Sequence, residues 1–377
     1  MNITTDKLFS LLKEGIWKCL TRIGILLRWI VLAGAAGVVL GLIGGCFARC
    51  ITIVTGFRTT HPWMLYLLPV AGLAIVAMYR LDPSRSGTNR VLEGISGGKY
   101  VPLRMAPLIM VSTVLTHAFG GSAGREGAAL QLGGSIGGTL GKWLKMDEYD
   151  QKIMIMCGMS AAFSALFGTP LTATVFSMEV VSVGIMQYAA LVPCSIAALT
   201  AREMAILVGA EGEHFTIPSG IPMDAKNITL VIILALLCAA VSILFCAVLH
   251  RTEHLYQKYV PNEWIRVVSG ALLIILLVKL LHTTDYLGTG MNIITKAISG
   301  EVVPTAFLLK MIFTAITLGC GFKGGEIVPT LFVGATFGCI FGQLTGFDPS
   351  LAAACGMVSV FCGVTNCPIS SLFLSFE

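Results

Sequence analysis

Apolar runs that recur along the whole chain constrain its fold more than any other feature. They cover residues 23–55, 63–78, 105–118, 153–167, 189–209, 228–248, 267–281, 305–318 and 351–364. A helix that crosses a bilayer needs about 20 predominantly apolar residues. The chain is 55% hydrophobic and 12% charged, whereas soluble domains are about 45–50% apolar and about 25% charged. The sequence therefore predicts an all-α polytopic membrane protein.

Several of the apolar segments are too short to cross a membrane, and Gly and Pro interrupt them. The segments broken in this way are residues 127–140, 170–183, 329–342 and 368–376. Broken helices at membrane depth are tolerated only where protein covers them or where they line a water-filled cavity. We therefore expect many tilted and half-spanning helices, which is typical of transporters.

Two glycine-rich loops, each carrying a glutamate, interrupt the apolar pattern. They are residues 124–127 (Gly-Arg-Glu-Gly) and residues 324–329 (Gly-Gly-Glu-Ile-Val-Pro). An ionisable group at membrane depth is costly and is by default a functional site. Glu126 and Glu326 are therefore the candidates for gating and proton coupling. Glu326 either titrates during transport or forms a fixed ion pair with a cation such as Lys323 or Arg125.

Three predicted helix starts could together bind an anion, because a helix N-terminus presents unpaired backbone N–H groups and a partial positive charge. The candidate anion-binding residues are Gly87, Thr88, Asn89, Gly124, Arg125, Gly127, Gly325, Ile327 and Val328. As a carboxylate, Glu126 would occupy this site itself; once protonated it would lose that attraction and swing away. The four glycines at 133, 134, 137 and 138 are expected to allow close helix packing instead.

An internal repeat organises the chain. Residues 124–128 match residues 325–329 at a spacing of 201, and Pro170 and Glu179 match Pro368 and Glu377 at a spacing of 198. We expect a cytoplasmic segment at 1–22 and a transport domain at 23–377, with repeats at about 23–210 and 228–377. Such repeats in transporters usually have inverted topology and meet at the binding site. Glu179 and Glu377 are expected to cap or pair near helix ends.

The remaining features exclude other functions. Basic residues that flank the first apolar run place the N-terminus in the cytoplasm and account for part of the net charge of +5 without nucleic acid; they are Lys7, Lys13, Lys18, Arg22 and Arg28. The twelve cysteines show no paired metal-binding spacing, so we expect neither a metal nor another cofactor. No nucleophile and base form a recognisable motif around Ser122 or Ser164, which argues against an enzyme. His117 is expected to be a packing or capping residue, with a proton relay as the alternative.

The two glycine loops resemble those of the CLC family of anion channels and transporters. Residues 124–127 are similar to its Gly-Arg-Glu-Gly-Pro loop, with Ala128 in place of the proline, and residues 324–329 are similar to its Gly-Gly-x-Phe-x-Pro loop. Residues 168–179 resemble the segment that carries a Glu-Glu pair. The resemblance implies an inverted-repeat helical fold in the lipid bilayer, and a homodimer with one anion pathway per subunit.

Departures from the chloride-handling pattern point to one branch of that family. Gly87 stands where chloride members have an anion-contacting serine, and Val180 follows Glu179 where antiporters carry a proton-relaying glutamate. The acidic residue Glu326, together with the altered loop at Gly87, resembles the pattern of the fluoride-exporting branch. The resemblance thus implies fluoride/proton antiport in a bacterial-type inner membrane, with a chloride-type transporter or a passive anion channel as alternatives. The family continues beyond the position of Glu377 with further helices, one of which brings a tyrosine towards the anion.

Overall fold

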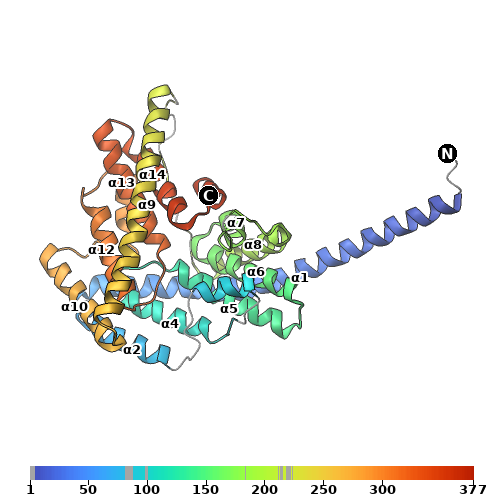
Figure 1. Cartoon of the computed structure of the whole chain (residues 1–377), viewed down its shortest axis with the longest axis horizontal. Coiled ribbons are helices and arrows are strands. Elements are labelled where there is room, and N and C mark those ends of the chain that lie inside the picture. Colours follow the sequence, from blue (N-terminus) through green and yellow to red (C-terminus); the bar gives the residue numbers. More distant parts are fainter. Residues whose placement is uncertain are drawn as a thin grey trace.

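The computed structural model describes residues 5–80, 88–97, 101–182, 184–210, 212, 215–217, 222 and 224–377. This part of the chain forms fifteen α-helices and two 3-10 helices (Figure 1). The α-helices are α1 (Thr5–Thr60), α2 (Leu68–Arg80), α3 (Thr88–Gly97), α4 (Met105–Ala118), α5 (Glu126–Trp143), α6 (Glu148–Phe167), α7 (Pro170–Glu179), α8 (Leu191–Leu207), α9 (Ala225–Tyr259), α10 (Glu263–Leu281), α11 (Met291–Ile298), α12 (Ala306–Gly319), α13 (Ile327–Thr345), α14 (Pro349–Thr365) and α15 (Pro368–Phe376). The 3-10 helices are η1 (Pro62–Leu67) and η2 (Tyr188–Ala190).

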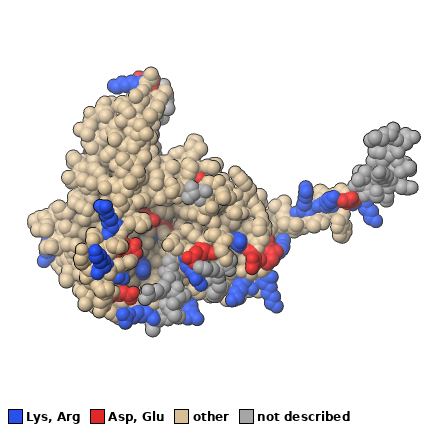
Figure 2. All heavy atoms as spheres, viewed as in Figure 1, with Lys and Arg blue, Asp and Glu red and all other residues tan. Residues whose placement is uncertain are grey.

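The helices divide into long spans and short segments, which confirms the all-α polytopic prediction. Within the described residues, six stretches are long and apolar enough to cross a membrane: Lys13–Thr60, Pro62–Arg80, Tyr188–Leu207, Ala225–Tyr259, Glu263–Leu281 and Ile327–Thr345. In contrast, α4 and α12 have 14 residues each, about 21 Å at 1.5 Å per residue, against a hydrocarbon core of about 30 Å. Figure 2 shows a face largely free of charge, with charged side chains gathered mainly along its lower part.

The sequence repeat appears as matched helices of opposite direction. α4, α5, α6 and α7 have the same order and similar lengths as α12, α13, α14 and α15. The two glycine loops meet in an isolated antiparallel bridge, in which Gly124 N–H donates to the Gly325 carbonyl at 2.6 Å and Gly325 N–H to the Gly124 carbonyl at 2.7 Å. This reciprocal exchange relates the two loops by a local two-fold axis, as expected where two equivalent halves meet.

Two glutamates at equivalent repeat positions cap each other's helices. Glu377, after α15, accepts hydrogen bonds from the N–H groups of Leu171 and Thr172 at the start of α7, at 2.8 and 2.7 Å. Glu179, the last residue of α7, accepts from the N–H groups of Ile369 and Ser370 at the start of α15, at 3.1 and 2.8 Å. The capping prediction is confirmed: the Glu179 carboxylate caps the N-terminus of α15.

Small residues let the central helices approach closely enough to hold the loops in place. At Gly133 and Gly137 of α5, an added Cβ would overlap the carbonyl oxygens of Gly158 and Met154 in α6. The same contact recurs between Gly334 of α13 and Gly356 of α14. The packing role expected for the glycines of α5 is confirmed.

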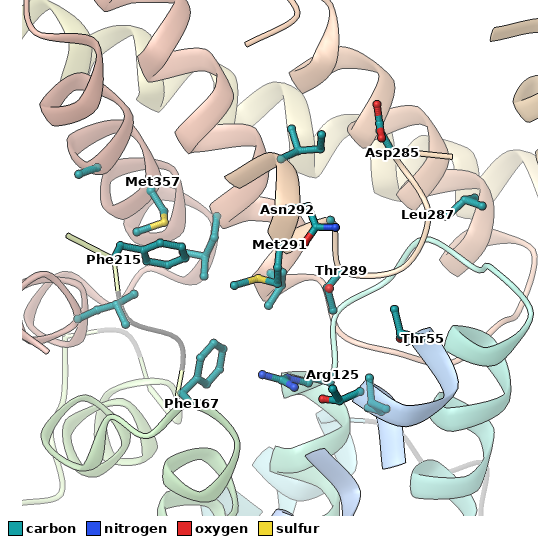
Figure 3. A pocket seen from close by; sticks show the side chains of 18 of the residues that line it. Thr55, Arg125, Phe167, Phe215, Asp285, Leu287, Thr289, Met291, Asn292 and Met357 are labelled. Carbon is teal, nitrogen blue, oxygen red and sulfur yellow. The ribbon is translucent and has the colours of Figure 1, made fainter. Parts of the chain in front are cut away.

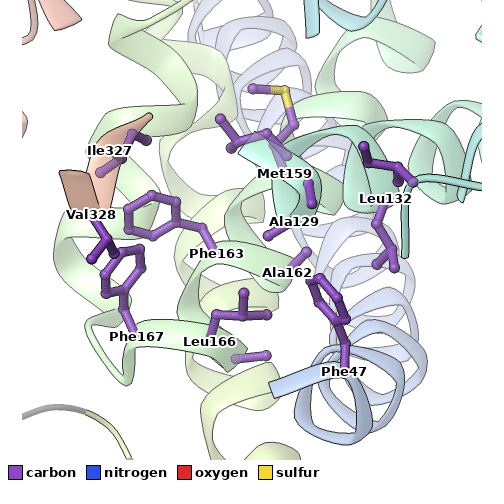
Figure 4. Close-up of a cluster of buried hydrophobic side chains, with 14 of the residues drawn as sticks. Phe47, Ala129, Leu132, Met159, Ala162, Phe163, Leu166, Phe167, Ile327 and Val328 are labelled. Carbon is purple, nitrogen blue, oxygen red and sulfur yellow. The ribbon is translucent and has the colours of Figure 1, made fainter. Parts of the chain in front are cut away.

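A cluster of buried side chains then fixes the start of α13 against the first repeat. Ile327 and Val328 belong to the same core as Phe163 and Phe167 of α6, and Figure 4 shows Val328 beside Phe167. All four side chains are less than a tenth exposed. The glycine loops are therefore seated on rigid, well-packed helices.

Gly158→Ala is expected to destabilise the protein by about 1–3 kcal/mol, because the new methyl group would overlap the backbone of Gly133. The measurement is a thermal melt of the purified protein in detergent. Gly34→Ala is the matched control, since Gly34 lies in α1 with nothing within 4 Å of an added Cβ. Equal melting temperatures for Gly158→Ala and the native chain would contradict the close packing.

Candidate anion-transport site

The start of α13 and the start of α5 meet at the centre of the candidate site. α5 begins at Glu126 and α13 begins at Ile327, and the bridge between Gly124 and Gly325 holds the two starts back to back. A Cβ at Gly325 would come within 2.6 Å of the Gly127 nitrogen. Glycine is therefore needed for the approach of the two loops.

The Glu126 carboxylate lies at this junction and is fully buried. Its Oε2 accepts hydrogen bonds from the backbone N–H of Arg125 at 2.9 Å and of Val328 at 3.4 Å. One donor precedes α5 and the other lies in the first turn of α13, so the carboxylate draws on both helix ends. Its Oε1 has no hydrogen bond in the part of the chain that the structure describes, and Gly124 leaves the space that the carboxylate fills.

Arg125 is the cation nearest to that carboxylate. Its Nε lies 3.9 Å from Oε1 of Glu126, and its Nη2 donates to the Leu166 carbonyl at 3.3 Å. A separation of 3.9 Å is longer than a charge-assisted hydrogen bond, which is about 2.7–2.9 Å. Glu126 is therefore held chiefly by backbone N–H groups, a restraint that protonation of the carboxylate would weaken.

The third predicted helix start lies beside α5, away from the junction. Thr88, the first residue of α3, accepts a hydrogen bond at its Oγ1 from Nε2 of Gln131, at 2.9 Å. Gln131 is five residues beyond Glu126 in α5, about 7.5 Å along the helix axis. Asn89 is exposed, and Gly87 lies outside the described residues. The structure thus brings two starts together and places the third against Gln131 of α5.

Glu326 occupies a different environment from Glu126. It is the residue before α13, its side chain makes no capping hydrogen bond, and it is exposed in the isolated chain. It interacts electrostatically with His250 and Glu253 of α9. No ion pair of Glu326 occurs among the described residues, and the Lys323 ammonium lies 4.6 Å from the centre of the Tyr79 ring. The structure therefore offers no support for the fixed ion pair.

A cavity of about 870 Å³ leads to the junction. It is lined by Arg125 and Val328, the residues that donate to Glu126, and by Arg58 of α1. Figure 3 shows Arg125, Thr289 and Asn292 around this space. Residues from α1, from the loop before α11 and from α14 complete its wall. The buried carboxylate is thus separated from a large cavity only by its immediate neighbours.

The family assignment follows from comparison with known proteins. The family model described as "Voltage gated chloride channel" matches residues 70–377. The chain belongs to this family, the CLC family. The resemblance read from the glycine loops is confirmed, and the family consists of channels and transporters.

Among curated relatives, a "Chloride/fluoride channel protein" of Pseudomonas syringae pv. tomato is 34% identical over 359 residues, 93% of this chain and 79% of that protein. Among solved structures, a CLC-type fluoride/proton antiporter has a TM-score of 0.89 at 32% identity and is matched over 93% of this chain and 90% of that one. A slow cyanobacterial Cl⁻/H⁺ antiporter has a TM-score of 0.79 at 20% identity, over 93% and 88%. At 20% identity, the cyanobacterial antiporter structure supports the CLC fold of this chain and carries no information about its anion.

Three polar residues near the CLC site were not singled out from the sequence. Gln131 contacts Thr88, Arg58 lines the cavity, and Lys310 of α12 is fully buried. Lys310 lies inside the apolar run 305–318, so the rule that drew attention to Glu126 and Glu326 applies to it equally. Arg58 follows the first apolar run by three residues, and no local pattern distinguishes it from a cation at a membrane surface.

Proposed function

We propose that this protein is a membrane antiporter that exports fluoride in exchange for protons, through a pore within each subunit of a homodimer. The observation that carries the proposal is the buried Glu126 carboxylate, bound by backbone N–H groups where two helix starts meet. The relative named for chloride and fluoride and the structural neighbour titled as a fluoride/proton antiporter support the same anion.

The exchange follows from competition for the same donors. The ionised Glu126 carboxylate holds the N–H groups of Arg125 and Val328. A proton removes its charge and its attraction to the two helix ends, so the side chain leaves and a fluoride ion takes those donors. When the proton is released, the carboxylate returns and displaces the anion. The same donors thus hold the carboxylate and the anion in alternation, and antiport requires that the proton and the fluoride ion leave to opposite sides of the membrane.

Fluoride is small and strongly hydrated, so leaving water requires several directed donors. The junction supplies backbone N–H groups, and we propose Gly127 and Ile327 as further donors beside Arg125 and Val328. Gly124 and Gly325, whose N–H groups already pair with each other's carbonyls, are proposed to hold the two loops together around the anion. About 7.5 Å further along α5, the Thr88 hydroxyl accepts from Gln131 and keeps its own proton as a donor. We infer that Thr88 and Asn89 form a second anion-binding position along the pathway. We extend this proposal to Gly87, which precedes them in the sequence.

The proposed setting is a bacterial inner membrane with the N-terminus in the cytoplasm. The basic residues Lys13, Lys18 and Arg22 lie on the exposed first part of α1, ahead of its apolar run, and Arg28 lies near the beginning of that run, which agrees with the positive-inside tendency. For the homodimer, α7 and α15 lie together and expose Leu171, Ile369 and Leu372. This apolar face suits a second subunit within the bilayer. We propose no enzymatic activity.

The test is ion flux from proteoliposomes loaded with fluoride or chloride. Fluoride efflux should exceed chloride efflux by more than tenfold, a discrimination above about 1.4 kcal/mol, and acidifying the outside should accelerate it, because protons enter as fluoride leaves. Equal rates for the two anions would return the protein to the chloride-type transporters. Fluoride efflux without proton uptake would indicate a passive channel.

A further inference from the structure

Arg58 is a buried arginine with unused hydrogen-bond donors on the wall of the cavity. Its side chain lies near the end of α1, and the residue is 9% exposed. Nη1 donates to the His117 carbonyl at 3.0 Å, and no carboxylate pairs with Arg58 among the residues that the structure describes. A guanidinium has five N–H groups. Four of them, and the charge, are left for a ligand in the cavity.

Lys310 adds a second buried charge behind the same wall. It is fully buried, and its Nζ donates to the carbonyls of Gly288 at 2.6 Å and Tyr286 at 3.2 Å. A Cβ at Gly288 would lie 3.2 Å from both terminal nitrogens of Arg58. The two cations therefore hold one loop segment between them, and Lys310 too has no carboxylate partner in the described part of the chain.

The loop between these cations directs negative dipole ends away from the cavity. The carbonyls of Tyr286 and Gly288 are bound by Lys310, while Leu287 and Thr289 line the cavity. Two like charges in a low-dielectric region repel one another, and an anion bound beside them lowers that cost. The wall is thus suited to attract a small anion.

The acidic residues of the cavity do not neutralise Arg58. Glu377 lines the cavity, but its carboxylate accepts two N–H bonds at the start of α7. Asp285 is exposed, and Figure 3 shows its carboxylate pointing away from Arg125 and Thr289. The charge on Arg58 therefore remains available to an incoming ligand.

We propose that Arg58 forms a second anion site in this cavity, which binds a fluoride ion on its path between the solvent and the junction at Glu126. This site rests on the proposed fluoride transport and is separate from the junction, where backbone N–H groups bind. Lys310 acts as a positioning residue, since it holds the loop carbonyls away from the ion. Arg125 and Val328, which line the same cavity, connect the two sites.

The test separates fluoride affinity from maximal transport rate. Arg58→Gln should raise the KM for fluoride in proteoliposomes about tenfold, equivalent to about 1.4 kcal/mol, and leave the maximal rate within about twofold. Arg58→Lys should recover most of the affinity because it restores the charge. Arg49→Gln is the matched control: Arg49 is also in α1 and donates Nη1 to a carbonyl, that of Val208 at 2.8 Å, but does not line the cavity. An unchanged KM in Arg58→Gln would overturn the site.

A second pair of variants serves if Arg58→Gln fails to fold. Thr289 lines the cavity, so Thr289→Glu should raise the fluoride KM and Thr289→Lys should lower it. Equal KM values for the two would overturn the proposal while leaving fluoride transport intact. If the native protein moves no fluoride, the proposed function fails instead. Thermal shift by sodium fluoride then still tests the cavity: stabilisation lost in Thr289→Glu supports the site, and equal stabilisation refutes it.

Discussion

Glu126→Gln is expected to abolish proton movement in a fluoride gradient, by at least about 100-fold, which corresponds to about 2.7 kcal/mol. The amide can accept the N–H bonds of Arg125 and Val328 through its oxygen, but it cannot release or take up a proton. It therefore mimics the protonated carboxyl permanently. Anion flux should be either blocked or uncoupled from protons. The measurement is the pH change inside fluoride-loaded proteoliposomes, alongside fluoride efflux recorded with an ion-selective electrode.

The control for Glu126→Gln is the same change at an exposed glutamate. Glu203 in α8 lies at the surface, where it pairs with Arg202 at 3.6 Å, so Glu203→Gln should transport both ions at the native rate. Stoichiometric proton transport that survives in Glu126→Gln would refute the role of Glu126. Loss of proton transport in both variants would point to damage unrelated to the junction.

The central junction could be predicted from sequence because its chemistry is local. Glycines flank Glu126 and a helix begins there, which implies backbone donors near a carboxylate. The sequence repeat matches Gly124 with Gly325, and it therefore predicted that the two loops are equivalent. The structure joins those same two residues by reciprocal hydrogen bonds. A repeat carries three-dimensional information, because equivalent residues meet where the halves face each other.

The position of α3 could not be predicted in the same way. Thr88 was expected to converge on the same point as the other two helix starts, yet it contacts Gln131. That placement depends on how Val91 packs where Gly134 leaves space in α5, a contact between segments more than forty residues apart. The spacing of polar residues within α3 therefore does not predict that Val91 packs against α5.

Backbone-carbonyl partners of buried charged residues could not be predicted from the sequence either. Arg58 and Lys310 both bind carbonyl oxygens that are distant in the chain, and any residue type can supply a carbonyl. For Glu326 the sequence offered Lys323, three residues before it, and Arg125, at the matching loop of the first repeat, as possible partners, but these cations lie against Tyr79 and Glu126. The partner of Glu326 could therefore not be read from the cations that the two loops carry.

Glu326 and Glu126 share one helix end, the start of α13. Glu326 directly precedes α13, and the N–H of Val328 in its first turn binds the Glu126 carboxylate. His250 and Glu253 of α9 add further titratable groups within electrostatic range of Glu326. On this placement we propose that Glu326 takes part in the transport cycle, although its side chain makes no hydrogen bond at the junction.

Glu326→Gln is accordingly expected to stop fluoride turnover while the protein stays folded and dimeric. The amide preserves the shape of the side chain and removes only its charge. Because Glu326 forms no ion pair in the described part of the chain and is exposed, no buried cation loses its partner, a loss that would cost about 3–5 kcal/mol. Glu301→Gln, at an exposed position before α12, is the matched control and should transport at the native rate. Gel filtration and thermal melting, recorded beside fluoride efflux, distinguish the outcomes. A melting temperature that falls together with transport would restore the ion-pair interpretation, and a stable dimer that transports at the native rate would show that Glu326 has neither role.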